Sequence, residues 1–430
     1  MRMPTSLKSR ITKKTATIAL IGLGYVGLPL AVSFAQKGFK VLGIDTNQAR
    51  VDRIRNLESY IADISNGEIK QVINRKLFSV TTDFSLLSEA DVIIICVPTP
   101  LKRKYTPDVS FILSAIKSVA LHLKKDSLVI LESTTYPGTT DEVIKPELEK
   151  SGMVAGCDFY VAFSPERIDP GNKEFKVTSM PKVVGGLTPK CTELAALVYS
   201  QITKHVHVVS STKAAEMTKL LENSFRIVNI GWINEIAQSC HKMNIDVWEV
   251  IKAANTKPFG FMAFYPGLGV GGHCIPEDPL YLYWKAKRYG FNSKFIKLAA
   301  DVNANMPQYV VGRLKELIKN PSKARILVLG VTYKKNVKDL RKSPPLKLIE
   351  LLQSWGGVDY YDPFVPYLKL GEINMESIIL NAATIKKYDC VVIAVDHTNV
   401  DYKLVYKNAR FIFDVKNIYS NIQDKKIARL

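Results

Sequence analysis

The 430-residue chain has few cysteines and no long hydrophobic run. The six cysteines form no CxxC pair, so a disulfide framework is not predicted. No apolar run approaches the roughly 20 residues that span a bilayer. The opening MRMPTSLKSRITKKT has no acid, no signal-peptide apolar region and no small-residue cleavage site. We therefore expect a cytoplasmic protein with no membrane partner, in which residues 1–15 form a frayed, solvated basic tail.

Metal and nucleic-acid binding have little support in the sequence. The six histidines show no ligand spacing, so no metal site is predicted. The formal net charge of +19 raises nucleic-acid binding as a hypothesis. However, the lysines are scattered, and neither an aromatic-interleaved basic run nor a zinc-finger or RNP-like pattern is present. We expect no nucleic-acid partner, and anionic small-molecule ligands fit the charge as well.

Two parts of the chain alternate apolar, strand-like runs with helical patterns, which is typical of a parallel sheet covered on both faces. The first part carries predicted strands within residues 15–24, 39–45, 78–83, 90–100, 127–134 and 160–166. The alternation returns near residue 321, with predicted strands within 324–335, 357–363, 388–398 and 409–417. Cys96 and Cys390 lie inside such runs, where a buried, inert thiol is the default.

Between these parts the pattern is helical. Residues 209–245 predict one long helix that Ser211 or Thr212 caps, 246–255 a shorter one, and 279–319 further helix. The predicted fold class is α/β, with two Rossmann-like parallel-sheet domains joined by a central helical domain. The predicted boundaries are 16–205, 206–318 and 319–430.

The segment IGLGYVGLPL carries G-x-G-x-x-G spacing between a predicted strand and a predicted helix. The first glycine permits the tight turn, the second lets the backbone approach a pyrophosphate, and the third lets helix and strand pack closely. Asp45 ends the next strand, where an acid accepts hydrogen bonds from an adenosine ribose and repels a 2′-phosphate, which favours NAD over NADP. Arg50 follows and either weakens that discrimination or binds the pyrophosphate. The predicted loop residues are Gly22, Leu23, Gly24, Tyr25, Val26 and Gly27.

Other predicted strands of the first part also end in polar residues. Pro98 and Thr99, Thr134, and Glu166 each follow one of them. Ligands bind beyond the carboxyl ends of parallel strands, so these residues are expected at the same cleft. Simple capping of a strand end is the alternative for each residue taken alone.

Cys274 follows a glycine loop and falls near a predicted helix N-cap, because Pro276 suits the first helical turn. A thiol at a helix N-terminus has a lowered pKa, and only the thiolate is a good nucleophile. Asp278 lies four residues on, on the same helical face. The alternative is a small buried cysteine packed at a tight helix entry.

A thiolate beside a nicotinamide cofactor suggests aldehyde oxidation through a thiohemiacetal and a thioester. Lys219 and Asn223 are spaced i, i+4 on the long helix, so together they could stabilise an oxyanion. Glu166 could serve with an ordered water as the base for hydrolysis. A solvated Lys and Asn on an exposed helix face is the alternative for the first two.

These residues carry a resemblance over essentially the whole chain. The matching pieces are IGLGYVGLPLA with Asp45, VPTP, ESTTYPGTT, SPERIDPG, AAEMTKLLENSFRIVNIGWINE, GLGVGGHCIPEDP and GVTYKKNVKDLRKSP. The chain resembles the UDP-glucose/UDP-mannuronate dehydrogenase family. The segment KPFGFMAFYPGLGVGGHCIPEDPLYL is most similar to the branch that oxidises UDP-N-acetylglucosamine.

The resemblance implies four-electron oxidation of a sugar C6 alcohol to a carboxylate by two NAD+ in turn, with a product that feeds surface polysaccharide or glycan synthesis. It implies that residues 16–205 bind NAD and that residues 319–430 bind the UDP-sugar. It also implies a homodimer or larger homo-oligomer through the long central helix. The implied catalytic residues are Cys274, Lys219, Asn223, Asp278, Glu166 and Thr134. Further implied ligand contacts are Arg341 to the cofactor, and Arg167, Phe264, Tyr265, Gly267, Gly271 and Lys334 to the substrate.

The chain departs from the branch pattern at a few positions. Asn336, Lys338 and Lys342 stand where acids are usual, and GLGVGG lacks the usual proline. UDP-glucose, UDP-N-acetylmannosamine and UDP-N-acetylgalactosamine therefore stay open as substrates. A two-electron dehydrogenase of the 6-phosphogluconate type and a non-catalytic nucleotide-sugar sensor are further alternatives.

Overall fold

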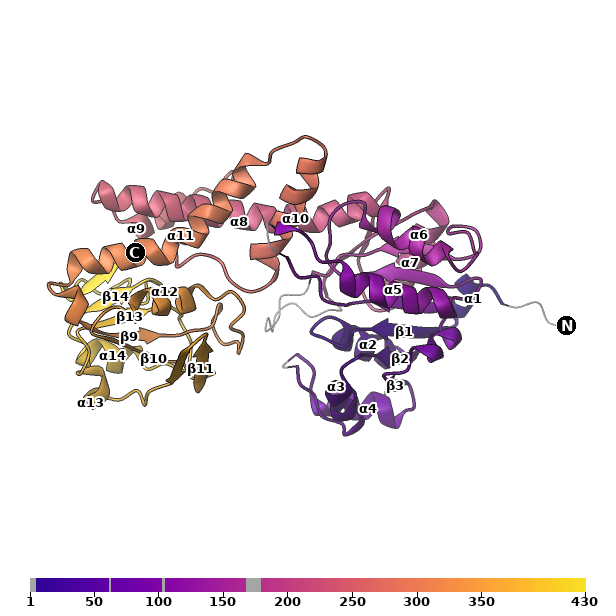
Figure 1. The fold of residues 1–430 in the computed structure, drawn as a ribbon, viewed down its shortest axis with the longest axis horizontal. Coiled ribbons are helices and arrows are strands. Elements are labelled where there is room, and N and C mark those ends of the chain that lie inside the picture. Colours follow the sequence, from indigo (N-terminus) through magenta and orange to yellow (C-terminus); the bar gives the residue numbers. More distant parts are fainter. Residues whose placement is uncertain (1–4, 62, 103–104, 168–178) are drawn as a thin grey trace. The chain divides into compact units, whose positions relative to one another are not determined.

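The structure is a computed structural model that describes residues 5–61, 63–102, 105–167 and 179–430. Residues 1–4 of the predicted tail and 168–171 of the SPERIDPG motif lie outside the described residues. The chain divides into two compact units, Met1–Glu222 with Trp284–Tyr289, and Asn223–Tyr283 with Gly290–Leu430 (Figure 1). The three predicted domains stay a prediction. Among the described residues, no helix is both long and apolar enough to cross a membrane.

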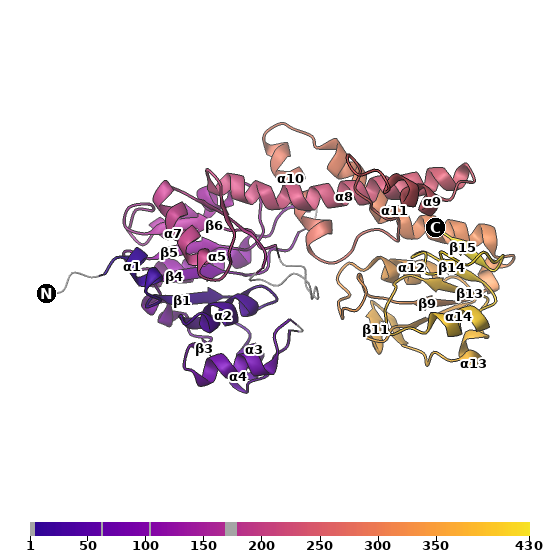
Figure 2. The same cartoon turned by 180° about the vertical axis from the view of Figure 1, so that it is seen from behind.

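The first unit is built on an eight-stranded sheet with the order β3-β2-β1-β4-β5-β6-β7-β8. Strands β1 to β6 are labelled in Figures 1 and 2. Neighbouring strands are parallel except β6 and β7, which are antiparallel. The strands are β1 Thr17–Ile21, β2 Lys40–Ile44, β3 Phe78–Thr81, β4 Val92–Ile95, β5 Leu128–Leu131, β6 Tyr160–Phe163, β7 Lys182–Gly186 and β8 Val206–Val208. All six predicted strands are confirmed, whereas β7 and β8 had not been predicted.

Helices cover both faces of this sheet, as continuous apolar strands require. Ile18 and Leu20 of β1 face one core with α2, α4 and α7, and the alternating Ala19 and Ile21 face a second core with α5 and α6. The helices are α2 Gly27–Gln36, α3 Gln48–Arg55, α4 Asn66–Asn74, α5 Ser110–His122, α6 Lys145–Glu149 and α7 Pro189–Ser200.

The prediction of a frayed, solvated tail is wrong for residues 7–12. These residues form a helix, α1 Leu7–Thr12, in which Leu7 and Ile11 are fully buried in the core beside α7. Their i, i+4 spacing places both side chains on one helical face. Burial of each contributes roughly 1.5–3 kcal/mol. Arg10 adds an ion pair, with Nε 3.3 Å from Asp91 Oδ1.

A long helix, α8 Thr212–Lys242, follows the first sheet. Its cap confirms the prediction, because Ser211 Oγ accepts a hydrogen bond from the Ala214 N–H at 3.2 Å. One turn into the helix, Glu216 accepts hydrogen bonds from the N–H groups of Gly138 and Thr140 at 2.5 and 2.9 Å. The start of α8 is thereby tied to the turn that follows β5.

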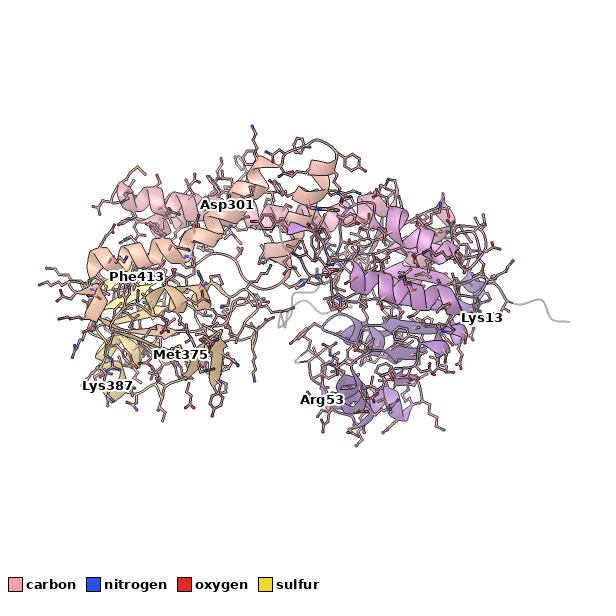
Figure 3. The ribbon with its side chains drawn as sticks, in the orientation of Figure 1. Lys13, Arg53, Asp301, Met375, Lys387 and Phe413 are labelled. Carbon is pink, nitrogen blue, oxygen red and sulfur yellow. The ribbon has the colours of Figure 1, made fainter. Side chains whose placement is uncertain are left out.

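The second unit holds a smaller parallel sheet with the order β10-β9-β13-β14-β15 and a separate antiparallel hairpin, β11-β12. Phe413 of β14, labelled in Figure 3, lies in the core that α11 and α12 share with the sheet. The strands are β9 Arg325–Leu329, β10 Gly357–Tyr361, β11 Tyr367–Leu370, β12 Ile373–Glu376, β13 Cys390–Ile393, β14 Ile412–Asp414 and β15 Ile427–Arg429. The helices are α9 Val247–Ala254, α10 Cys274–Arg288, α11 Lys294–Leu317, α12 Pro344–Leu352, α13 Ala382–Ile385 and α14 Tyr402–Asn408. Of α10, the residues from Trp284 onward belong to the first unit.

We predict that Glu216 makes stability depend on pH. Burial raises its pKa to about 7, although Thr140 and Gly138 donate hydrogen bonds to it. A carboxyl whose pKa is raised by folding stabilises the fold fully at pH values below its unfolded-state pKa. That contribution is lost as pH rises through the folded-state pKa of about 7. Between about pH 5 and about pH 8, the stability advantage of wild type over Glu216→Gln should therefore fall by about 3 kcal/mol.

Thermal midpoints of both proteins across this pH range measure the effect. Glu89→Gln is the matched control, because the Glu89 side chain is 58% exposed in an ion pair with Lys40. The control should follow wild type at every pH. A difference between wild type and Glu216→Gln that stays constant with pH would contradict the prediction.

Candidate active site

The predicted glycine loop is a tight turn between β1 and α2. Gly22 has φ +90°, a backbone conformation that favours glycine. A Cβ on Gly27 would lie 1.9 Å from the Gly22 carbonyl oxygen, so the helix can approach the strand this closely only with glycine. At Gly24, by contrast, a Cβ would meet nothing within 4 Å. The first backbone N–H groups of α2 also receive no side-chain cap from Val26. These features fit a dinucleotide pyrophosphate at this turn.

Asp45, just past the end of β2, fastens the same loop. Its buried carboxylate accepts hydrogen bonds from the Leu23 and Asn47 N–H groups, both at 2.8 Å. Arg50 Nη1 lies 3.2 Å from Asp45 Oδ2. Tyr60, which the sequence analysis missed, donates its hydroxyl proton to the Leu23 carbonyl at 2.5 Å. The acid and Arg50 therefore lie together at the edge where the ribose is expected.

The remaining predicted cofactor residues of the first unit follow β4 and β5. These strands continue the sheet on one side of β1, so their carboxyl ends lie at the same edge. The two ends are fastened to each other, because Ser133 Oγ donates to the Val97 carbonyl at 2.7 Å. Pro98 is exposed, Thr99 buried and Thr134 half-buried.

Glu166 follows β6 at this edge and is buried. Its Oε1 accepts a hydrogen bond from the Arg167 N–H at 2.6 Å, and its Oε2 lies 3.2 Å from Lys182 Nζ. The Arg167 side chain instead pairs with Glu222 at 2.7 Å. Lys182 was missed by the sequence analysis, although a lysine in the apolar run PKVVGG was an available signal.

The buried polar residues of the long helix rule out the solvated alternative. Lys219 and Asn223 lie one turn apart on α8 with only 8% and 5% of their surfaces exposed. Asn223 Nδ2 donates a 2.6 Å hydrogen bond to Asp278 Oδ2 on α10. An amide and a carboxylate are thus paired in a buried position.

Cys274 is the first residue of α10, which confirms the expected helix start. The alternative of a small buried cysteine is wrong, because Cys274 is exposed and forms no disulfide. Asp278 follows one helical turn later and is 1% exposed. The structure therefore presents a thiol at a helix N-terminus, where the helix dipole favours the thiolate.

The glycines before Cys274 are required by close backbone packing. A Cβ on Gly271 would lie 2.6 Å from Tyr333 Cβ and 2.8 Å from the Lys342 carbonyl oxygen. Gly272 has φ +86°, and its N–H donates to the Arg341 carbonyl at 2.8 Å. The cysteine loop is therefore held directly against residues 333–344.

Two of the unusual residues in that segment have structural partners. Lys342 Nζ lies 2.9 Å from Glu277 Oε1, which links the segment to α10. Asn336, at φ +60°, accepts a hydrogen bond from the Thr398 N–H at 3.0 Å, and its own N–H donates to Nδ1 of the buried His397 at 3.0 Å. Asparagine tolerates this backbone conformation better than most residues. Within the part of the chain that the structure describes, no hydrogen bond or ion pair explains Lys338.

The predicted substrate loop is held by contacts to α8 and α9. The Tyr265 ring stacks on Trp248 at 5.9 Å, and Phe264 meets Phe225 edge-on at 5.7 Å. The Gly267 N–H donates to Asn234 Oδ1 at 2.9 Å.

The Arg341 guanidinium forms a two-pronged pair with Asp339, which raises the pKa of Arg341.

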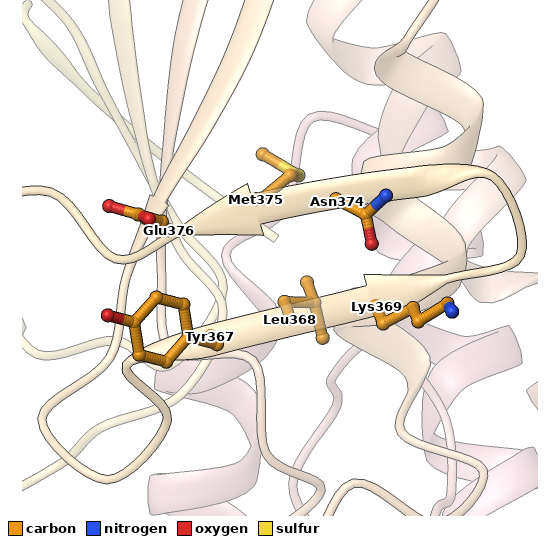
Figure 4. A pocket seen from close by; sticks show the side chains of 6 residues that line it. All are labelled: Tyr367, Leu368, Lys369, Asn374, Met375 and Glu376. Atoms are coloured by element: carbon orange, nitrogen blue, oxygen red, sulfur yellow. The ribbon is translucent and has the colours of Figure 1, made fainter.

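The remaining features are the two strand cysteines, metal binding and a surface hollow. Cys390 is buried and its pKa is raised by burial to about 12, which confirms an inert thiol. Cys96 keeps some exposed surface, yet burial also raises the pKa of its thiol. Within the described ranges, no cluster of His, Cys, Asp and Glu could hold a metal ion. A hollow of about 320 Å³ lies on the β11-β12 hairpin between Tyr367 and Glu376 (Figure 4), and no predicted site residue lines it.

The turn between β1 and α2, the acid after β2 and the polar strand ends define a class of protein, the dinucleotide-binding dehydrogenases. Comparison with known proteins narrows this class. Three family models match, described as the NAD binding, central and UDP binding domains of the UDP-glucose/GDP-mannose dehydrogenase family. The matched residues are 16–203, 213–305 and 327–421. The chain belongs to this family and is an NAD-dependent UDP-sugar dehydrogenase.

Two similar proteins are named after different sugar substrates. The chain is 41% identical to UDP-N-acetyl-D-glucosamine 6-dehydrogenase of Pseudomonas aeruginosa, over 82% of this chain and 84% of the relative. It is 36% identical to UDP-N-acetyl-D-mannosamine dehydrogenase of Pyrococcus horikoshii, over 93% and 95%. A solved UDP-D-ManNAc dehydrogenase structure from P. horikoshii aligns with a TM-score of 0.86 at 35% identity, over 96% and 98% of the two chains. These likenesses leave the sugar open.

We predict that two glycines of the β1-α2 turn have separable roles. Gly27→Ala places a methyl group against the Gly22 carbonyl and should destabilise the first unit by about 1–3 kcal/mol. Gly24→Ala meets no protein atom, so stability should stay near wild type, while NAD+ affinity falls by about tenfold or 1.4 kcal/mol.

Thermal midpoints and NAD+ titration by calorimetry measure the two effects. Gly312→Ala on α11 is the control, since a Cβ there also meets nothing within 4 Å. It should change neither NAD+ affinity nor folding beyond a small gain in helix propensity. Wild-type NAD+ affinity in Gly24→Ala would show that the pyrophosphate does not approach this residue.

Proposed function

We propose that the chain oxidises the C6 alcohol of a UDP-N-acetylhexosamine, with UDP-N-acetylglucosamine as the preferred substrate, to the UDP-uronic acid. The reaction removes four electrons and uses two NAD+. The observation that carries the proposal is Cys274 at the first residue of α10, one turn before an Asp278 that is hydrogen-bonded to Asn223. A two-electron alcohol dehydrogenase needs no such thiol.

The first unit supplies the cofactor site in this proposal. Gly22 to Gly27 and the N-terminus of α2 would hold the pyrophosphate, and Asp45 with Arg50 would hold the adenosine ribose. Pro98, Thr99 and Thr134 would line the remaining edge, and Arg341 of the last domain would reach the cofactor. Bound NAD+ supplies the acceptor for each hydride that leaves C6.

The residues of α8 and α10 would manage charge at C6. The Cys274 sulfur bonds to the C6 carbon of the aldehyde, and the carbonyl electron pair moves onto its oxygen. Lys219 and Asn223 would stabilise that oxygen, and Lys219 would give it a proton to form the thiohemiacetal. Lys219 would take that proton back when the second hydride leaves C6, which gives the thioester. Asp278 accepts the 2.6 Å hydrogen bond from Asn223 and would accept the proton of a C6 hydroxyl.

Hydrolysis of the thioester completes the proposed reaction. Glu166, with Thr134 on the neighbouring strand end, would hold a water and take its proton. The hydroxide bonds to the acyl carbon, and the Cys274 thiolate leaves with the electrons of the C–S bond. The product is the UDP-uronic acid.

The substrate would lie on the glycine and aromatic loop and on the last domain. Phe264, Tyr265, Gly267 and Gly271 would line the sugar. Arg167 would act beside Glu166, and Lys334 would contact the UDP-sugar. Residues 319–430 would form the UDP-binding domain, in agreement with the family match to 327–421.

Three finer points belong to the same proposal. The 41% identity to a UDP-N-acetyl-D-glucosamine 6-dehydrogenase supports the sugar, while UDP-N-acetylmannosamine and UDP-glucose are the alternatives. The enzyme would act in the cytoplasm and feed polysaccharide or glycan synthesis.

The enzyme would form a homodimer through α8, where Leu221, Phe225 and Trp232 are exposed. Sedimentation equilibrium would report the mass of the assembly.

A panel of UDP-sugars tests the function directly. We expect close to two NADH per sugar, with the highest kcat/KM for UDP-N-acetylglucosamine. A higher value for UDP-N-acetylmannosamine or UDP-glucose would overturn the sugar assignment. One NADH per sugar, or turnover of 6-phosphogluconate, would overturn the four-electron reaction, and no NADH with any sugar would indicate a sensor.

Replacing Cys274 with Ser tests the covalent step. Because a hydroxyl is a far weaker nucleophile than a thiolate, NADH should stop at one or fewer per active site, and kcat should fall by at least about 10³-fold. Stopped-flow absorbance at 340 nm, with product analysis, measures both. Cys157→Ser, at another exposed cysteine, is the matched control and should keep wild-type turnover. Full two-NADH turnover by Cys274→Ser would contradict the role of the thiol.

A further inference from the structure

A buried cluster of charged groups lies beside Glu166 in the first unit. Lys182 Nζ is 2.8 Å from Glu132 Oε1 and 3.2 Å from Glu166 Oε2, so one cation bridges two carboxylates. The three side chains are 4%, 0% and 11% exposed, respectively. Lys182 Nζ also lies 5.1 Å from the ring centre of Tyr199, whose hydroxyl donates to Glu132. The glutamate assigned to hydrolysis is therefore one end of a four-residue buried network.

The antiparallel direction of β7 places the cation at this position. In the β6-β7 pairing, Phe163 lies opposite Gly185. Continuing that register by three residues in each direction puts Glu166 opposite Lys182. If β7 were parallel to β6, its first residue, Lys182, would lie at the opposite edge of the sheet from Glu166. Glu132, the residue after β5, completes the bridge, because Leu131 of β5 is paired with Phe163.

The charges of this network follow from the contacts. Burial lowers the pKa of Lys182, but the charges of Glu132 and Glu166 outweigh it and the net direction is upward, so the ammonium persists. Burial raises the pKa of Glu132 to about 7, although Lys182 opposes this. Burial likewise raises the pKa values of Tyr199 and of Cys96, which follows β4, so both stay neutral.

We propose that Lys182 is a positioning residue that keeps the Glu166 carboxylate ionised and correctly oriented for thioester hydrolysis. Glu132 and Tyr199 anchor the ammonium group. Lys182 touches neither the substrate nor the reacting carbon in this role. The inference rests on the proposed function of Glu166 as the base.

A purely structural role explains the network less well. Replacing a whole buried ion pair with apolar groups is often neutral or even stabilising, so stability alone does not explain why a charged network stands here. An ammonium 3.2 Å from a carboxylate, in contrast, favours its charged form and directs one of its oxygens. A general base must be ionised and held in place at neutral pH.

Lys182→Met and Glu132→Gln test the proposal through opposite shifts in pH dependence. Removing the cation leaves two neighbouring carboxylates, so the acidic limb of kcat should move to higher pH by about 1–3 units. Glu132→Gln removes the second carboxyl partner of Lys182. The ammonium then pairs with Glu166 alone, so the acidic limb of kcat should move to lower pH. Lys182→Arg should restore the wild-type limb. A merely structural defect would not move the two limbs in opposite directions.

The hydrolysis step itself provides a second readout. In Lys182→Met the first NADH should form at the wild-type rate, whereas hydrolysis slows by about 10- to 100-fold. The thioester on Cys274 should then accumulate and appear in the intact protein mass after rapid acid quench. Lys190→Met is the matched control, since Lys190 forms an exposed 3.0 Å pair with Glu193.

Glu166→Gln separates failure of this inference from failure of the proposed function. If Glu166→Gln turns over normally, Glu166 is not the base and the proposed function of that residue fails. If Glu166→Gln accumulates thioester while Lys182→Met does not, and the limbs do not shift in opposite directions, only the role of Lys182 is overturned. If Lys182→Met does not fold, the different expectations for Lys182→Arg (the wild-type limb) and Glu132→Gln (a limb at lower pH) still decide, since equal behaviour of these two variants would overturn the proposal.

Discussion

The first unit depends on one constraint, that charge buried at the edge of a sheet must be paired. Glu132 and Glu166 follow adjacent parallel strands, so their carboxylates meet at the same edge and would repel each other. Lys182 lies within ion-pair distance of both and reduces this repulsion, because β7 runs antiparallel to β6. The change of strand direction between β6 and β7 therefore makes it possible to keep two acids beside the cofactor edge.

Close backbone approach is the second constraint, and it recurs in both units. Gly27 packs against the Gly22 carbonyl in the first unit, and Gly271 packs against Tyr333 and Lys342 in the second. Neither contact leaves room for a side chain. In one place the result is a tight turn at the start of α2, and in the other a cysteine at a helix start. The same small residue thus builds a cofactor turn and a nucleophile loop by the same steric argument.

Much of the candidate site could be predicted because its residues lie at fixed distances along single elements. The helix start at Cys274, the turn to Asp278 and the pair Lys219 and Asn223 are all local features of α8 and α10. Tyr60 and Lys182 were missed because each meets its partners across the fold. The tail was mispredicted for a related reason, since Leu7 and Ile11 form a helix only with a core to cover them.

Periodicity, glycine spacing and strand-end polarity in the sequence by themselves determined the alternation of strands and helices, the dinucleotide turn and the reactive cysteine. Each rests on interactions within a few residues, which the order of the chain dictates. Only the tertiary structure decided that Lys219 and Asn223 are buried, that the glycines before Cys274 contact residues 333–344, and that Lys182 bridges two glutamates. These depend on strand direction and on packing between distant segments, and no local pattern encodes either.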